Sequence, residues 1–181
     1  DPSLGRKGAE AGREGLSKIV HNADLVFITA GLGGGTGTGI APVVADEAKR
    51  SGALVVGIVT TPFHVERRQR MQRALEGLDQ LRKTCDAVLV LDNNRLLHYV
   101  PNLPLDEAFS IMDQLIAEIV KGIIETITLP SLINLDFADV KAVMKDAGSA
   151  LMGIGSATGE NRAVEAAQKA IESPTGPDTH Q

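Results

Sequence analysis

The sequence has 181 residues, of which 43% are hydrophobic, and it carries a formal net charge of −5 at pH 7. This length suffices for one domain with a genuine core and part of another, and the acidic balance disfavours nucleic-acid binding. The single cysteine, Cys85, excludes an internal disulfide framework, and no apolar run approaches the roughly 18 residues of a membrane helix, so we expect a cytoplasmic protein without direct membrane insertion.

Three short apolar runs, each typical of a buried strand, lie at residues 24–29, 53–59 and 86–91. Helix-like segments at 40–51 and 66–84 separate them. This alternation is typical of right-handed βαβ crossovers. We therefore predict an α/β fold with a parallel sheet, half of a doubly wound domain.

The second half of the chain is predominantly helical. Apolar residues recur at three- and four-residue spacing over 106–128, which predicts one long core helix. A loop at 129–136 leads to a short amphipathic helix at 138–145. We then expect a strand at 151–155 and a helix at 161–172.

A glycine-rich segment connects the first predicted strand to the helix that follows it. Its centre is the heptapeptide Gly33, Gly34, Gly35, Thr36, Gly37, Thr38 and Gly39. Backbone without side chains lets amides approach phosphate oxygens, the threonines add hydroxyl donors, and the next helix, with Pro42 in its first turn, presents its positive end. We predict an anion cradle. A flexible glycine linker fits poorly, because linkers do not lie between a buried strand and a helix.

The spacing excludes two common phosphate-binding motifs. Ile40 occupies the lysine position of G-x-x-x-x-G-K-S/T, so the segment is not a P-loop. No register gives G-x-G-x-x-G either, because the third glycine position falls on Thr36, Thr38 or Ile40. A dinucleotide-binding fold is therefore disfavoured.

The heptapeptide reads GGGTGTG and matches the signature of the tubulin/FtsZ family residue for residue. The resemblance covers about residues 1–173 and is strongest to archaeal FtsZ. Residues 1–9 resemble the loop that lies over the γ-phosphate in that family, and residues 134–140 resemble its catalytic loop. The resemblance implies the C-terminal half of a Rossmann-like parallel-sheet GTPase domain, a long core helix and the start of a second α+β domain.

The same resemblance implies a division of the chain. Residues 1–128 would form a partial GTPase domain that includes the core helix, and residues 129–146 the catalytic (synergy) loop with its following helix. Residues 147–173 would begin the C-terminal domain, and residues 174–181 would form a disordered tail. Because the family's first strands would precede Asp1, we expect a partial chain that binds GTP weakly by itself.

Residues 62–70 read PFHVERRQR and are similar to the family pattern P-F-x-x-E-G-x-x-R. The match implies that Glu66 accepts hydrogen bonds from ribose hydroxyls and that Arg70 approaches the phosphates. Arg67 stands where the family usually has glycine, and Thr61 where it often has lysine. From the residues alone, the segment also fits a solvated basic start of a helix.

Three further positions match a guanine site. Asn93 aligns with a family asparagine near the base, while Phe109 and Asp113 lie four apart on one face of the long helix. An aromatic ring can stack on a purine, and a carboxylate can accept from N1–H and the 2-amino group of guanine. By spacing alone, Phe109 fits ordinary core and Asp113 a solvated acid.

Asn134, Asp136 and Asp139 form the pattern N-x-D-x-x-D after the core helix. The resemblance implies that they act on the nucleotide of a neighbouring copy, where they orient the attacking water while Mg²⁺ accompanies the nucleotide. Either aspartate can also cap the next helix. The four histidines show no ligand spacing, so we predict no metal site built by the protein.

As a whole, the resemblance implies a cytoskeletal protein that binds GTP and GDP and hydrolyses GTP on self-assembly, with the division ring as its setting. Its partners would be further copies in a head-to-tail filament and membrane tethers of the division machinery. Two other interpretations stay open: a nucleotide-dependent scaffold without turnover, and an α/β enzyme with a phosphorylated substrate.

Overall fold

The computed structural model is built around one parallel sheet. It describes residues 1–94, 104–128, 137–145, 148–150, 155 and 157–172. Within these ranges the sheet has four strands in the order β1-β2-β3-β4, with every neighbouring pair parallel. The strands are β1 (Leu25–Gly31), β2 (Leu54–Thr61), β3 (Ala87–Asp92) and β4 (Gly148–Ala150). The predicted parallel α/β fold is confirmed.

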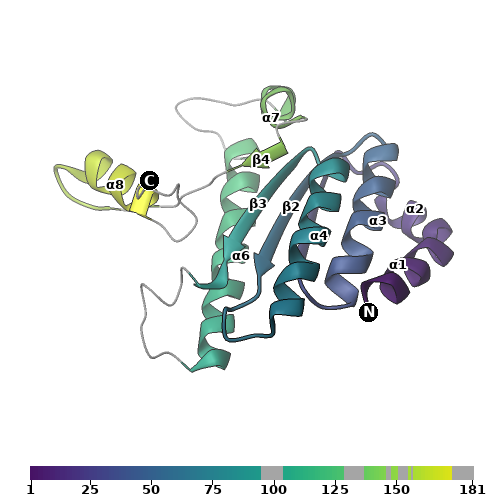
Figure 1. Cartoon of the computed structure of the whole chain (residues 1–181). Helices are drawn as coiled ribbons and strands as arrows, with labels where there is room; N and C mark the ends of the chain where they lie inside the picture. Colours follow the sequence, from purple (N-terminus) through teal and green to yellow (C-terminus); the bar gives the residue numbers. More distant parts are fainter. Residues whose placement is uncertain (95–103, 129–136, 146–147, 151–154, 156, 173–181) are drawn as a thin grey trace.

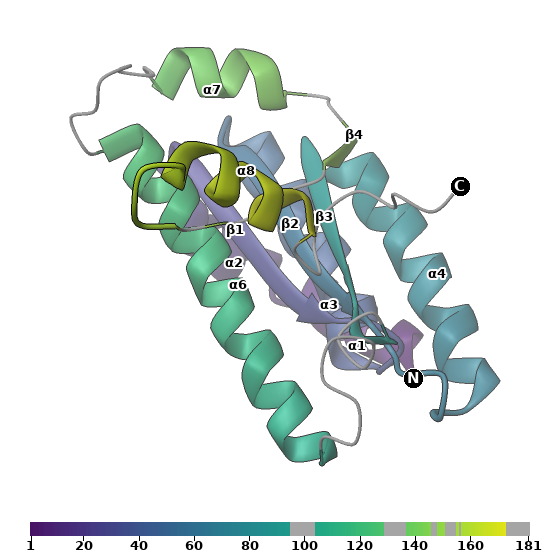
Figure 2. The ribbon, with the colours of Figure 1, turned by 90° about the vertical axis from the view of Figure 1, so that its left-hand side faces the viewer.

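Helices cover both faces of the sheet (Figure 1 and Figure 2). Those described are α1 (Pro2–Ala11), α2 (Arg13–Val20), α3 (Thr36–Arg50), α4 (Arg68–Thr84), α6 (Leu105–Thr128), α7 (Phe137–Met144) and α8 (Arg162–Glu172). On one face α3 and α4 pack against the strands, and α1 lies on the outer side of α3. The long helix α6 covers the other face. None of the described helices has the length and apolarity needed to cross a membrane.

The central strand β2 separates two hydrophobic cores. Seven of its eight residues are buried. Val55 and Val59 belong to the core beneath α3 and α4, whereas Leu54, Val56 and Ile58 belong to the core beneath α6. Because both faces are covered, successive side chains are apolar, and the strand shows a continuous hydrophobic run instead of alternation.

Helix α3 begins at Thr36, earlier than the predicted start at residue 40, so the second half of the heptapeptide forms its first turn. Pro42 consequently lies inside the helix, and its predicted place in the first turn is wrong. The reason is packing: α1 approaches so closely that a Cβ on Gly39 would overlap the Pro2 carbonyl oxygen. This contact compensates for the low helix propensity of glycine.

Residues 1–9, which resemble a family loop, form a helix in the structure, because α1 starts at Pro2. Its first turn has two favourable features. The Asp1 carboxylate accepts a hydrogen bond from the Ser3 amide at 2.9 Å, and proline occupies the first helical position, where no amide donor is needed. The segment therefore packs beside the glycine loop as a rigid element.

In the C-terminal part, the predicted helices at 138–145 and 161–172 are confirmed as α7 and α8 to within one residue. The strand predicted at 151–155 falls largely outside the described residues. A short strand, β4, lies just before it and pairs with the first half of β3. The predicted tail at 174–181 is outside the described residues.

Candidate functional site

Three segments meet at the carboxyl edge of the sheet. The heptapeptide follows β1, residues 62–67 follow β2, and Asn93 follows β3. Figure 1 shows this edge at the same end of the molecule as the N-terminus. Open α/β sheets bind their ligands at the carboxyl ends of the strands. The topology thus brings the sequence-predicted segments together.

Hydrogen bonds fix the shape of the glycine loop. The Leu32 amide donates to the Thr60 carbonyl at 2.9 Å, which holds the loop against β2. The Gly33 amide donates to the Thr38 hydroxyl at 2.8 Å, and Gly33 itself has a φ of +96°, which favours glycine. Thr38 is buried and turned back into the loop, whereas Thr36 is exposed. The two threonines therefore differ in their access to a ligand.

The heptapeptide glycines also differ in their surroundings. A Cβ on Gly35 would lie 2.7 Å from the Asp1 nitrogen, and one on Gly37 would overlap the Gly31 carbonyl oxygen. Around Gly34, in contrast, no atom lies within 4 Å of an added Cβ. Packing therefore demands glycine at Gly35 and Gly37, while the backbone of Gly34 faces open space.

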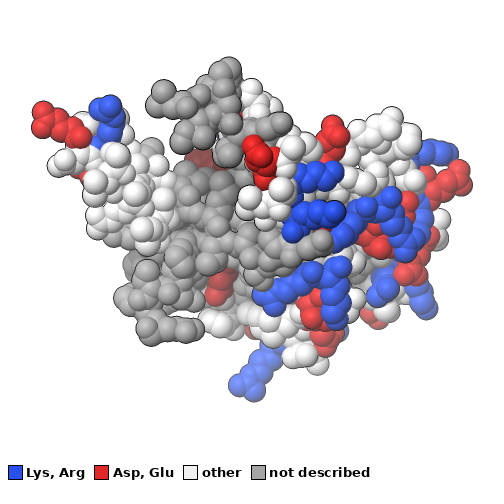
Figure 3. All heavy atoms as spheres, turned by 90° about the horizontal axis from the view of Figure 1, so that it is seen from above, with Lys and Arg blue, Asp and Glu red and all other residues white. Residues whose placement is uncertain are grey.

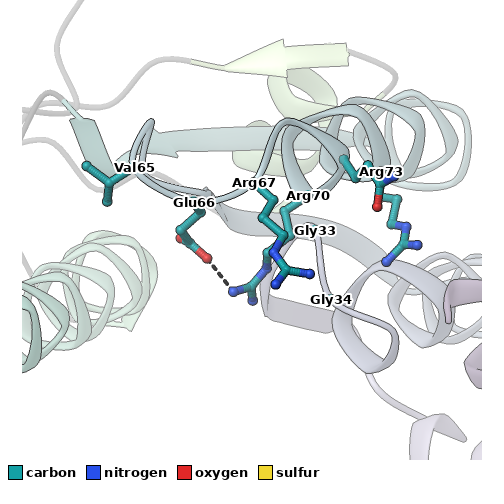
Figure 4. Close-up of a pocket in the computed structure, with 8 residues that line it drawn as sticks. Gly33, Gly34, Val65, Glu66, Arg67, Arg70 and Arg73 are labelled. Carbon is teal, nitrogen blue, oxygen red and sulfur yellow. Dashed lines mark hydrogen bonds and ion pairs between the residues drawn. The ribbon is translucent and has the colours of Figure 1, made fainter.

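That open space is a cavity of about 530 Å³ between the glycine loop and the start of α4. It is lined by Gly33, Gly34, Val65, Glu66, Arg67, Gln69, Arg70 and Arg73 (Figure 4). Glu66 and Arg70 form an ion pair within it. The other Glu66 oxygen accepts a hydrogen bond from the Phe63 amide at 3.0 Å, which fixes the carboxylate at the cavity rim.

A smaller cavity, of about 110 Å³, adjoins the first and shares Gly34, Glu66 and Arg70 with it. Asn93 and Phe109 also line it, so it joins residues from four segments of the chain. Asn93 is only 3% exposed, and its Oδ1 has no hydrogen-bond partner among the residues that the structure describes. Because a buried polar atom without a partner is costly, this oxygen fits a ligand that donates a hydrogen bond.

Phe109 is 44% exposed, and its ring meets Phe63 edge to face with the centroids 5.5 Å apart. One edge of the ring is thus fixed, while the rest stays accessible. Asp113 is exposed on the next turn of α6 and does not line either cavity. The structure therefore brings Phe109 to the cavity and leaves Asp113 in solvent beside it.

Sequence reasoning missed Asn94, which is buried and holds the loop after β2. Its Oδ1 accepts from the His64 amide at 2.6 Å, and its Nδ2 donates to the Pro62 carbonyl at 3.2 Å and to Asp92 Oδ1 at 2.8 Å. Asp92 also accepts from the Thr61 hydroxyl at 3.2 Å. The run of polar residues at the end of an apolar strand was the signal that could have revealed this network.

Asp139, the described acid of the predicted catalytic loop, lies at the other end of the sheet. Asn134 and Asp136 lie outside the described residues, but Asp139 lies exposed in the first turn of α7. The Lys141 ammonium of the same helix donates to the Gly52 carbonyl, just before β2, at 3.2 Å. Asp139 is therefore separated from the glycine loop by the length of β1, roughly 20 Å at ~3.3 Å per residue.

Figure 3 views the molecule from this α7 end, where Lys and Arg side chains gather over the ends of α3 and α4. The last turn of α3 carries Lys49 and Arg50, and that of α4 carries Arg82 and Lys83. Cations at helix C-termini complement the negative end of the helix dipole. Among the described residues, no cluster of three His, Cys, Asp or Glu side chains is arranged to hold a metal ion.

Comparison with known proteins agrees with this arrangement. The model of the tubulin/FtsZ family, GTPase domain, matches residues 1–101. Cell division protein FtsZ 2 of Halobacterium salinarum is 55% identical over 174 residues, which cover 96% of this chain and 44% of that protein. Cell division protein FtsZ 2 of Methanocaldococcus jannaschii is 55% identical over 161 residues, 89% of this chain and 42% of that protein.

A solved structure described as an empty FtsZ dimer from M. jannaschii superposes with a TM-score of 0.91 at 47% identity, over 97% of this chain and 51% of that one. These matches place the chain in a class of α/β proteins, and the description of the matching family model names a GTPase domain. The chain belongs to the tubulin/FtsZ family. It spans less than half the length of the two curated relatives.

Proposed function

We propose that the protein binds GTP, assembles head to tail into filaments and hydrolyses the nucleotide at the contact between two copies. The placement of the two halves of the site supports this. The glycine loop lies at the carboxyl edge of the sheet and Asp139 near the opposite edge, too far apart to serve one ligand. Head-to-tail stacking brings unlike ends together, so each contact completes one site.

Guanine is the base that the smaller cavity suits. A purine can stack on the accessible face of Phe109, and the buried Asn93 oxygen can accept a hydrogen bond from the base. We assign the Asp113 carboxylate to N1–H and the 2-amino group of guanine. Adenine presents no such pair of donors, so this set of acceptors selects guanine.

The phosphates bind along the glycine loop in this proposal. The open backbone of Gly34 and the exposed hydroxyl of Thr36, with Gly35 between them, lie at the N-terminus of α3, whose dipole favours an anion. Arg70 adds a positive charge, and Glu66 has lone pairs left to accept from ribose hydroxyls. We assign the other loop residues, Gly33, Gly37, Thr38 and Gly39, to shaping this cradle.

Hydrolysis needs a water molecule aimed at the γ-phosphorus of the neighbour's nucleotide. Asp136 and Asp139 orient this water and draw its proton, and Asn134 helps to position it. Mg²⁺, when bound with the nucleotide, offsets charge on the phosphates, as do the backbone dipoles of the loop. In a free copy no neighbour brings these acids to the nucleotide, so free copies stay nearly inactive.

We further propose that the filament works in the cytoplasm as the cell-division ring and is tethered to the membrane by partner proteins. The names of the relatives, which are cell division proteins, support this role. The intact aspartates distinguish it from a scaffold without turnover.

The dependence of GTPase rate on protein concentration tests the proposal. Completion of the site by a second copy predicts a rate that rises more steeply than linearly, because the number of contacts grows faster than the number of copies. A rate proportional to concentration would mean that one copy holds the whole site. Binding and assembly without any turnover would favour the scaffold instead.

A further inference from the structure

The larger cavity contains more positive charge than the proposed ribose and phosphate contacts use. Three arginines, Arg67, Arg70 and Arg73, and one carboxylate, Glu66, line it, which leaves a net charge of +2. Arg70 is paired with Glu66. Arg67 and Arg73 have no hydrogen bond or ion pair from their side chains to any described residue.

Both unpaired arginines line the larger cavity. Arg67 directly precedes α4 and Arg73 lies in its second turn, and Figure 4 shows both side chains on the side of Gly33 and Gly34. Helix α4 starts at Arg68 without a side-chain cap, and the Arg70 amide of its first turn donates to the Arg67 carbonyl at 2.8 Å. The carbonyl oxygen of Arg70 lies against Gly33, where an added Cβ would be 2.8 Å away, so α4 is held directly against the glycine loop.

The two cavities are neighbours that share lining residues. Gly34, Glu66 and Arg70 border both, with Asn93 and Phe109 on one side and Arg67 and Arg73 on the other. A nucleotide whose base meets Phe109 and whose ribose meets Glu66 therefore directs its phosphates past Gly34 towards the unpaired arginines. Arginine suits this place because its planar fork of donors matches phosphate oxygens.

We propose that Arg67 and Arg73 form a phosphate-binding subsite at the start of α4. This inference rests on the proposed GTP-binding function and extends it. Arg67 stands at a position where the family pattern usually has glycine, so the subsite is a feature of this chain's own sequence. The phosphate groups come either from the nucleotide's own chain or from free inorganic phosphate.

The test compares Arg67→Ala and Arg73→Ala with Arg68→Ala, which removes the same charge from the same helix but from a side chain that does not line the cavity. Dissociation constants for GTP, GDP and GMP are measured by displacement of a fluorescent GTP analogue at low and high salt. Separate titrations with pyrophosphate and inorganic phosphate, followed by calorimetry, use no guanine. Circular dichroism spectra verify the fold of each variant.

With the nucleotide as the source of the phosphate, each cavity variant should weaken GTP binding by about fivefold, as expected for a partly exposed ion pair, and should weaken its salt dependence. If the nucleotide supplies the phosphate, GTP and GDP lose more affinity than GMP does. If free phosphate occupies the subsite, the inorganic anions lose affinity and the nucleotides do not. Arg68→Ala should leave all of these values unchanged.

Three results would overturn the subsite. The variants could leave the affinity for every phosphate ligand unchanged, or they could lower the affinities for GTP, GDP and GMP equally. They could also alter self-assembly alone, as substitutions in a protein contact would. Failure of the proposed function is recognised separately, because it appears as absence of GTP binding by the unmodified protein. Pyrophosphate binding would still report on the arginines in that case.

Discussion

Replacing single glycines of the heptapeptide with alanine should separate those that serve packing from those that face a ligand. In Gly39→Ala the added carbon overlaps the Pro2 carbonyl oxygen and lies 3.0 Å from the Arg6 nitrogen, both of them backbone atoms of α1. To restore an ordinary carbon–oxygen contact of about 3.3 Å, α1 must move by roughly 1 Å. In Gly34→Ala the added carbon meets nothing within 4 Å.

The expected free energies follow from these contacts. Overpacking costs about 1–3 kcal/mol, and the upper end applies at Gly39 because rigid backbone must shift. Alanine has a more favourable helix propensity than glycine by about 1 kcal/mol, which offsets part of this cost. Gly39→Ala should therefore lower the free energy of unfolding by about 2 kcal/mol. Gly34→Ala should leave it unchanged or raise it by up to about 1 kcal/mol, through reduced freedom of the unfolded chain.

Urea denaturation followed by far-UV circular dichroism measures both values, since the chain has no tryptophan to report by fluorescence. GTP affinity is measured on the same samples. Gly34→Ala should weaken GTP binding without lowering the free energy of unfolding, because the added methyl group enters the cavity. Equal losses of stability in the two variants, or a larger loss in Gly34→Ala, would refute the division of the motif into packing and ligand-facing glycines.

Two other predictions concern the base site and the buried thiol. Asp113→Asn should weaken GTP binding by about tenfold, as expected for the loss of a charged hydrogen bond. Binding of ITP, which lacks the 2-amino group, should weaken by less. Equal losses of affinity for GTP and ITP would contradict the guanine assignment. Burial, with a neighbouring carboxylate, raises the pKa of Cys85 from 9.0 to about 11. At pH 8 iodoacetamide should therefore modify this thiol only when the protein unfolds, and rapid labelling of the native protein would refute the raised pKa. The thiol's contribution to stability should fall as the pH rises from about 9 to 11.

Apolar periodicity and continuous apolar runs predicted those helices and strands whose bounds are set by their own residues. The core helix over 106–128 and the strand at 53–59 are confirmed within two residues, the helix through its regular spacing of apolar residues and the strand through its nearly continuous burial. The start of α3 was missed because it depends on α1, and no local rule places glycines at a helix start. Tertiary packing decided that boundary.

At the site, the sequence indicated Glu66, Asn93 and Phe109, and these three line one cavity in the structure. Two features could not be predicted from motif spacing. The pairing of Glu66 with Arg70, in preference to another arginine of the segment, and the unpartnered Asn93 oxygen become visible only when their neighbours are placed. Spacing identifies candidate residues, but which polar atoms remain free is a property of the packed molecule.

A complementation assay tests most directly whether two copies share one site. In one variant, Asp136→Ala removes an acid and leaves the nucleotide site intact; in the other, Gly34→Trp blocks the cavity and leaves the acids intact. Each should be inactive alone. Mixed in equal amounts they should recover about a quarter of the normal GTPase rate, because that fraction of random head-to-tail contacts joins a competent nucleotide site to competent acids. A mixture that assembles and binds GTP yet stays inactive would contradict the shared site.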